Sequence, residues 1–582
     1  MKKQDFIKGS IILMLSAAIA KMLGALFKIP LTNMLGGVGM GYFSCAYSLF
    51  LPIYALTVTG LSSAVARLTA QSTALEMYEN AKKVHKTALK LFFAAGLAGS
   101  IIIAVLARPF SVYVAKSPDA WISVTLIAPS VLFGCITAVE RGYYEGLCNM
   151  YPTAFSQLAE GLVKMLAGLF FCSLVNQNSQ LILNYLPDGT DIRAAAAGAG
   201  IFGVTLSSVG AALFFPIMRI FLPKENKCGD KTLIKTGDIS KELISIALPI
   251  GISSVVTNLT AIIDLGTLIG CIDMFKGHYV LPEGTEHSDL PQFIYGSFSG
   301  IAVTVFNLVP SITNMLGKGI LPAITCAWER HDKAAMKKST LQALTASAFM
   351  AVPAAVGLGV LSAPVLNFLF PKQPEEVAVC IKALQLLMPG MVCLCVSFPV
   401  FSMLQAIGKP SAPLKIMLIG ALVKLAGNIL LIPFMGVDGS ALSTSICYAV
   451  ILILSLFVYL KTANIKLSAK PFISITYSGL ICGICAMLCH DRFSYCFSDT
   501  ISLFLSVGAG GLGYLLMMKV CEYSKAKNKG SAASCMEIHL KINSNSIKSF
   551  HRFPLLHLMN LMLMYSAVLL SFLFPYTRNG LY

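Results

Sequence analysis

Six basic side chains lie within long apolar runs of the chain or at their ends: Lys21, Lys28, Arg67, Arg141, Lys164 and Lys424. A charge inside an apolar membrane segment is costly, so it usually faces the interior of a helix bundle or water. We therefore select these six residues as candidates for substrate binding, and we predict no catalytic residue.

Several of these residues also have a purely structural interpretation. The Lys28 side chain can extend to the outer interface, whereas Arg67 and Arg141 can anchor the cytoplasmic ends of their segments. Lys21 lies seven residues before Lys28, so a helix places both on one face. A cavity-facing role is favoured for Lys21 and Lys424.

Three carboxylates are candidates for ion coupling. Asp264 lies near the middle of a long apolar run, where a buried carboxylate can exchange a proton or hold a sodium ion. Its alternative is a capped polar residue close to the outer end of that run. Glu160 lies four residues before Lys164, which favours an ion pair, and Glu145 is the third candidate. No metal site or cofactor is predicted, and coupling to Na⁺, H⁺ or the membrane potential stays open.

Composition places this sequence among membrane proteins. The 582 residues are 56% hydrophobic and 12% charged, with a mean hydropathy of +0.75, whereas soluble domains carry about 25% charged residues. The net charge of +17 would suggest nucleic acid for a soluble protein. Here cationic loops that set membrane orientation explain it, so no nucleic-acid partner is expected.

About fourteen segments are long and apolar enough to span a bilayer. They are residues 9–33, 42–66, 87–107, 120–140, 153–175, 195–218, 242–270, 293–317, 340–370, 378–404, 411–432, 439–460, 471–489 and 499–521. With a cytoplasmic N-terminus, the inside loops hold 29 Lys and Arg and the outside loops hold 6. This asymmetry predicts an all-α polytopic membrane protein with its N-terminus in the cytoplasm.

The chain also repeats itself. Leu-Val-Lys with a nearby Ala-Gly occurs at Lys164 and again at Lys424, 260 residues later, and the Gly60 region has a counterpart at Gly319, 259 residues later. Two six-helix lobes related by a pseudo-two-fold axis along the membrane normal are therefore expected, with two extra helices. The expected parts are an N-lobe (1–240), a C-lobe (241–466), the extra helices (467–523) and a tail (524–582), in which 554–576 is a possible further span.

The motifs resemble a known family. Lys21-Met-Leu-Gly, Phe27-Lys-Ile-Pro-Leu and Gly60-Leu-Ser-Ser-Ala are similar to the polysaccharide-biosynthesis branch of the multidrug/oligosaccharidyl-lipid/polysaccharide flippase superfamily. The run from Arg141 to Glu160 resembles the stage V sporulation protein B subgroup. The resemblance covers roughly residues 5–520. The family usually has Gln where this chain has Glu145, and often Arg at position 164.

The resemblance implies a flippase of the bacterial cytoplasmic membrane. It would move undecaprenyl-pyrophosphate-linked saccharides, including the peptidoglycan precursor lipid II, to the outer leaflet by alternating access, in spore cortex or cell-wall synthesis. A monomer is expected. The alternative is a cation-coupled multidrug exporter of the same superfamily, which would favour acidic cavity residues. An enzyme is not expected, because the largest outer loop, 273–289, has no zinc motif and is too short for a folded catalytic site.

Overall fold

The computed structural model describes residues 6–184, 187, 190–221, 235–274, 288–409 and 411–527. The expected tail from residue 528 onward, including 554–576, lies outside these residues. The α-helices are α1 (Phe6–Tyr54), α2 (Gly60–Ala74), α3 (Tyr78–Pro109), α4 (Trp121–Ile127), α5 (Pro129–Gly146), α6 (Tyr151–Gln177), α7 (Ser179–Leu183), α8 (Ile192–Phe221), α9 (Thr236–Met274), α10 (Leu290–Ser297), α11 (Val303–Phe306), α12 (Leu308–Glu329), α13 (Lys333–Val360), α14 (Ser362–Leu369), α15 (Pro374–Ala406), α16 (Ser411–Met435), α17 (Val437–Ala463), α18 (Lys470–Phe493) and α19 (Asp499–Lys527).

The prediction of an all-α polytopic membrane protein is confirmed. Among the described residues, eleven helices are long and apolar enough to cross a membrane, or twelve if the bent pair Leu290–Phe306 and Leu308–Asn314 is one span. One of the eleven, Leu15–Ala74, is a 60-residue run that holds most of the first expected segment (9–33) and all of the second (42–66). Each of the fourteen segments expected from the sequence lies on one helix or on consecutive helices; the segments 42–66, 120–140, 293–317 and 340–370 each cross a break between helices.

Two kinds of break interrupt these helices: a glycine break between the first two expected spans of the N-lobe, and a π-helical turn in the second expected span of each lobe. Within α1, Gly36 has φ 68° and ψ −177°, a conformation that is open to glycine and to few other residues. The helix therefore stops at Leu35 and starts again at Gly37. A π-helical turn, Ala55–Thr59, then joins α1 to α2, and another, Phe298–Ala302, joins α10 to α11. Such π-turns occur frequently at functional sites.

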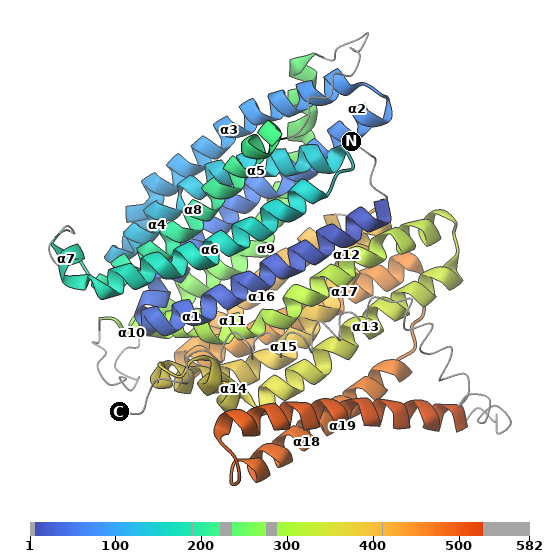
Figure 1. Ribbon diagram of the computed structural model, residues 1–582. Coiled ribbons are helices and arrows are strands. Elements are labelled where there is room, and N and C mark those ends of the chain that lie inside the picture. Colours follow the sequence, from blue (N-terminus) through green and yellow to red (C-terminus); the bar gives the residue numbers. More distant parts are fainter. Residues whose placement is uncertain are drawn as a thin grey trace. The chain divides into compact units, whose positions relative to one another are not determined.

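We use the name N-lobe for residues 1–240 and the name C-lobe for residues 241–466. These boundaries are the ones expected from the sequence, and they stay predictions. In Figure 1 the N-lobe helices are blue to green, and α6 packs against both α1 and α8. The α6–α8 approach is close, because a Cβ added to Gly203 would overlap the backbone of Gly168. In the C-lobe, α17 packs against α15 and α16, and α9 packs against α16.

The described residues up to Tyr514 form one compact unit, and a second unit begins at Leu515. Within the first unit the two lobes meet where α1 contacts α10 and where α2 contacts α9. All contacts discussed below lie within this first unit.

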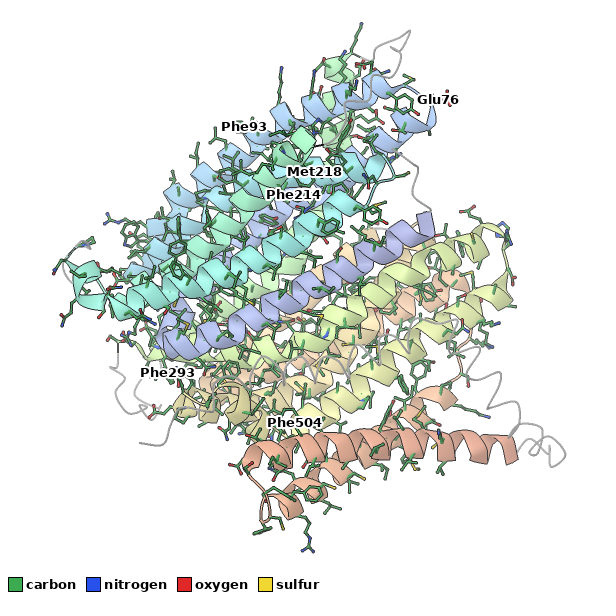
Figure 2. The ribbon with its side chains drawn as sticks, viewed as in Figure 1. Glu76, Phe93, Phe214, Met218, Phe293 and Phe504 are labelled. Carbon is green, nitrogen blue, oxygen red and sulfur yellow. The ribbon has the colours of Figure 1, made fainter. Side chains whose placement is uncertain are left out.

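One face of α3 shows how the bundle meets lipid. Phe93, Leu97, Ile101 and Val105 follow one another at four-residue spacing, and their side chains are 48%, 42%, 54% and 68% exposed, respectively. Phe93 lies on the surface of α3 in Figure 2. Residues four apart share a helix face, so this is a continuous apolar stripe that suits contact with acyl chains rather than water.

Candidate anion-binding site

Two lysines come together in the N-lobe. Lys28 on α1 and Lys164 on α6 are both half-buried, and their like charges lie close enough to repel one another. In the described part of the chain, no carboxylate lies within ion-pair distance of either ammonium group. Two neighbouring cations without an acidic partner favour the binding of an anion, because a bound anion offsets their repulsion.

Aromatic rings hold the Lys164 side chain in place. Its Nζ lies 5.6 Å from the ring centroid of Phe27 and 5.3 Å from that of Tyr47, within the range of cation–π attraction. Phe27 is fully buried against α6, where its ring faces Gly168. The Tyr47 hydroxyl is buried and has no hydrogen-bond partner among the described residues. A buried hydroxyl without a partner can donate a hydrogen bond to a ligand oxygen.

Arg141 and Glu160 form a separate ion pair. Arg141 Nη2 lies 2.7 Å from Glu160 Oε2 and 2.8 Å from the Ser156 hydroxyl, and the Arg141 side chain is 16% exposed. The sequence spacing favoured a pair between Glu160 and Lys164, but Glu160 binds the arginine of α5 instead. The carboxylate is thereby neutralised by a neighbouring helix, and the charge of Lys164 is left for another partner.

Three further candidates lie at more open positions. Lys21 on α1 and Arg67 on α2 are exposed, and Glu145 on α5 is half-buried. Lys21 and Glu145 each make a polar interaction with another residue. The structure does not bring Arg67 into the Lys28–Lys164 pair. The roles of these three residues stay predictions.

A buried polar cluster occupies the C-lobe between α9, α16 and α17. Lys424 Nζ lies 2.6 Å from Asp264 Oδ2, and the lysine side chain is only 3% exposed. Asn428 Nδ2 donates to Asp264 Oδ1 at 3.1 Å and to the Thr267 hydroxyl at 2.8 Å, and the Ser440 hydroxyl lies 3.4 Å from Asp264 Oδ1. Lys424 therefore neutralises the one carboxylate that we selected for ion coupling in this lobe.

The two lysines of the sequence repeat thus have different surroundings. Lys164 lies on the fifth expected span of the N-lobe and contacts aromatic rings, whereas Lys424 lies on the fifth expected span of the C-lobe and contacts a carboxylate. The cavity-facing role that is favoured for Lys21 and Lys424 from the sequence stays a prediction. In the structure, Lys28 lies near Lys164, and Lys424 forms an ion pair with Asp264.

One buried cluster was not foreseen. Glu140, which is 3% exposed, pairs with Arg219 of α8 and lies 3.3 Å from His85 Nε2 of α3. The His85 ring also lies against Tyr143, with centroids 4.4 Å apart. Glu140 precedes Arg141 directly, so this end of α5 has an ion pair on each of two faces. The run Glu140-Arg141 is the only sequence signal, and it does not reveal which partners the two charges find.

Comparisons with protein families and with individual proteins agree with one another. The polysaccharide biosynthesis protein family matches residues 6–328, and the lipid II flippase MurJ family matches residues 292–504. Stage V sporulation protein B of Bacillus subtilis (strain 168) is 24% identical over 529 residues, which cover 89% of this chain and 96% of that protein. Lipid II flippase MurJ of the same organism is 21% identical over 535 residues, covering 88% and 94%.

Solved structures share the fold. A lipid II flippase MurJ in an inward closed conformation aligns with a TM-score of 0.65 at 16% identity, covering 89% of this chain and all of that one. An inward-facing multidrug resistance MATE family transporter of the MOP superfamily aligns with a TM-score of 0.60 at 14% identity, covering 78% and 98%. The family match spans more than half of the chain, and the expected resemblance is confirmed: this chain belongs to the polysaccharide biosynthesis protein family.

Proposed function

We propose that this chain is a flippase that moves a polyprenyl-pyrophosphate-linked saccharide from the cytoplasmic to the outer leaflet of the bacterial cell membrane. The observation that carries the proposal is the pair Lys28 and Lys164, two neighbouring cations without a carboxylate partner in the described chain. A pyrophosphate diester carries two negative charges, and two ammonium groups match them. The Tyr47 hydroxyl adds a donor beside them.

The physics of the crossing supports such a site. The pyrophosphate must traverse a low-dielectric core roughly 30 Å thick, where an unpaired charge is very costly. Fixed cations within the bundle lower that cost, while the polyprenyl tail stays in lipid. Glu160 does not compete for Lys164, since Arg141 binds it at 2.7 Å.

The relatives support a cell-wall precursor as the cargo. Two of them bear the names lipid II flippase MurJ and stage V sporulation protein B, so the substrate class we propose is a lipid II-like peptidoglycan precursor, in vegetative wall or spore cortex synthesis. The protein would act as a monomer and as a transporter rather than an enzyme. A cation-coupled multidrug exporter would need an acidic residue that is available to its cargo. Asp264 in the C-lobe cluster does not meet this need, because it forms an ion pair with Lys424.

Reconstitution tests the proposal directly. Purified protein in proteoliposomes should move fluorescent undecaprenyl-pyrophosphate saccharide between leaflets at least about tenfold faster than protein-free vesicles. The same vesicles should not accelerate an uncharged polyprenol, because it lacks the pyrophosphate that the two lysines bind. Transport of cationic drugs with no movement of the lipid-linked saccharide would contradict the proposal.

Orientation can be measured separately. Single cysteines at Lys82 and Lys333 should be labelled by an impermeant maleimide only after the cytoplasmic side is made accessible. Cysteines at Lys116 and Lys372 should be labelled in intact cells, because these positions lie in the loops that carry few basic residues. One position labelled from the wrong side would refute the fourteen-span topology.

A further inference from the structure

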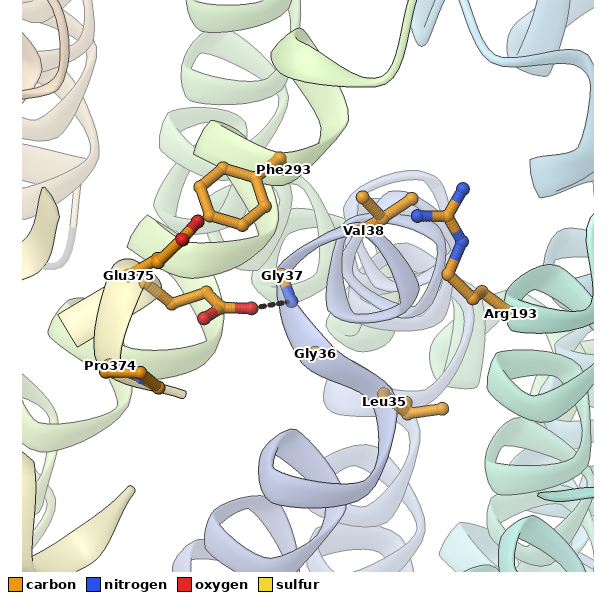
Figure 3. A pocket seen from close by; sticks show the side chains of 9 residues that line it. Leu35, Gly36, Gly37, Val38, Arg193, Phe293, Pro374 and Glu375 are labelled. Atoms are coloured by element: carbon orange, nitrogen blue, oxygen red, sulfur yellow. Dashed lines mark hydrogen bonds between the residues drawn. The ribbon is translucent and has the colours of Figure 1, made fainter. Parts of the chain in front are cut away.

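The break in α1 leaves a helix start that the opposite lobe caps. Because α1 starts again at Gly37, the first N–H groups of the new helix have no partner within it. The Gly37 N–H donates to Glu376 Oε1 at 2.9 Å, shown by the dashed line in Figure 3. Glu376 lies in the first turn of α15 and is 8% exposed. A carboxylate at a helix N-terminus stabilises it, so a C-lobe residue caps an N-lobe helix.

Two ion pairs join the lobes near the same end. Arg193 on α8 binds Asp289, the residue before α10, while its Nε lies 2.8 Å from Asp191 Oδ2. Lys116, between α3 and α4, lies 2.7 Å from Asp273 Oδ2 near the end of α9. Each pair takes its cation from the N-lobe and an anion from the C-lobe.

The backbones of the two lobes also touch here. A Cβ added to Gly296 on α10 would overlap the Gly37 carbonyl oxygen, and one added to Gly41 would lie 2.6 Å from the Gln292 carbonyl oxygen. A pocket of about 340 Å³ adjoins this contact, lined among others by Gly36, Arg193 and Phe293 (Figure 3). Glycines therefore allow a close approach that larger residues would block.

We propose that these contacts form an outer latch: the cap from Glu376 to Gly37, the pairs Arg193–Asp289 and Lys116–Asp273, and the glycine contact at Gly296. The inference rests on the proposed function, because a flippase must separate the outer ends of its lobes to release cargo outward. Charged side chains suit a latch that opens repeatedly. Water can hydrate the charged groups when they separate, so opening requires less free energy than exposing an apolar contact of the same size.

The test removes latch charges and measures the exposure of a native thiol. Cys45 is fully buried, and it follows Ser44, whose hydroxyl accepts a hydrogen bond from Ser299 of the other lobe at 2.8 Å. In Glu376→Gln and Asp289→Asn, N-ethylmaleimide should modify Cys45 about tenfold faster than in the wild type, since a hydrogen bond to a charged group contributes on that order. Mass spectrometry reads each site, with the exposed Cys496 as internal standard.

Two controls separate the latch from general loosening. Glu79→Gln removes an ion pair within α3 alone, at 2.8 Å from Lys82, and should leave Cys45 unchanged. Lys116→Asp and Asp273→Lys should each speed the modification, and the double reversal should return it toward the wild-type rate. Unchanged Cys45 reactivity in both latch variants, or failure of the double reversal to restore it, overturns the latch. The thiol-modification experiment contains no substrate. Its result therefore does not depend on whether the flipping assay succeeds.

Discussion

Replacing Lys424 with alanine is expected to destabilise the protein by about 3–5 kcal/mol, because it strands a carboxylate in the bundle. The Asp264 side chain is 15% exposed and loses the ammonium group 2.6 Å away. Its remaining partners among the described residues are neutral, such as Asn428. Thermal unfolding in detergent should show the loss as a lower midpoint, and the amount of protein in the membrane should fall with it.

A second variant separates charge from packing. Lys424→Met together with Asp264→Asn removes both charges at similar volume, and the new amide oxygen can still accept a hydrogen bond from Asn428. The unfolding midpoint should recover most of the loss. As a matched control, Lys382→Ala breaks a pair in the same lobe, 3.0 Å from Asp438, but that lysine is 69% exposed, so less than about 1 kcal/mol should be lost. Equal losses in Lys424→Ala and Lys382→Ala would refute the argument from burial.

The same double variant addresses ion coupling. If Asp264 couples flipping to an ion gradient, a stable variant without that carboxylate should still fold but should no longer respond to the gradient. An unchanged response in proteoliposomes would assign the Asp264–Lys424 pair to the fold alone. The comparison is possible because the double variant separates loss of the charge from loss of stability.

The sequence predicts the helices well, since runs of about 20 apolar residues have few other uses. It does not predict where helices break. Gly36 and Gly37 are adjacent glycines in an apolar run, and many such pairs in membrane helices serve packing instead. The π-turn at Ala55–Thr59 leaves no compositional mark at all. Both features depend on the opposite lobe, which caps or contacts these segments.

The sequence indicated which charged residues lie within the helix bundle better than it indicated their ion-pair partners. Glu160 and Lys164 have the spacing of a helical ion pair, yet Arg141 from another helix takes the carboxylate. Asp264 and Lys424 are 160 residues apart, so no local rule links them. Each was singled out because a charge in an apolar span needs a reason. That argument selects residues, whereas tertiary packing chooses their partners.

Neutralising either lysine of the N-lobe pair should slow flipping strongly without destabilising the fold. Lys28→Gln and Lys164→Gln each remove one of two cations that face the proposed pyrophosphate. The lost charge-assisted hydrogen bond corresponds to roughly ten- to a hundredfold slower flipping, at about 1.5–3 kcal/mol. In Lys28→Gln the unfolding midpoint should stay level or rise, because the change relieves repulsion between Lys28 and Lys164. Lys164→Gln relieves the same repulsion but also removes the cation–π contacts with Phe27 and Tyr47, so its midpoint should stay level. Lys164→Arg keeps the charge and should retain more activity than Lys164→Gln.

This combination of slower flipping and undiminished stability distinguishes a binding site from a structural charge. Lys90→Gln, which removes an exposed lysine from α3, should change neither quantity. A lower unfolding midpoint in Lys28→Gln would mean that the Lys28 ammonium group is held by favourable contacts. Full flipping in both Lys28→Gln and Lys164→Gln would contradict the cationic binding site. In the wild type, a soluble pyrophosphate should slow flipping by competing for both lysines, and Lys28→Gln should weaken that competition.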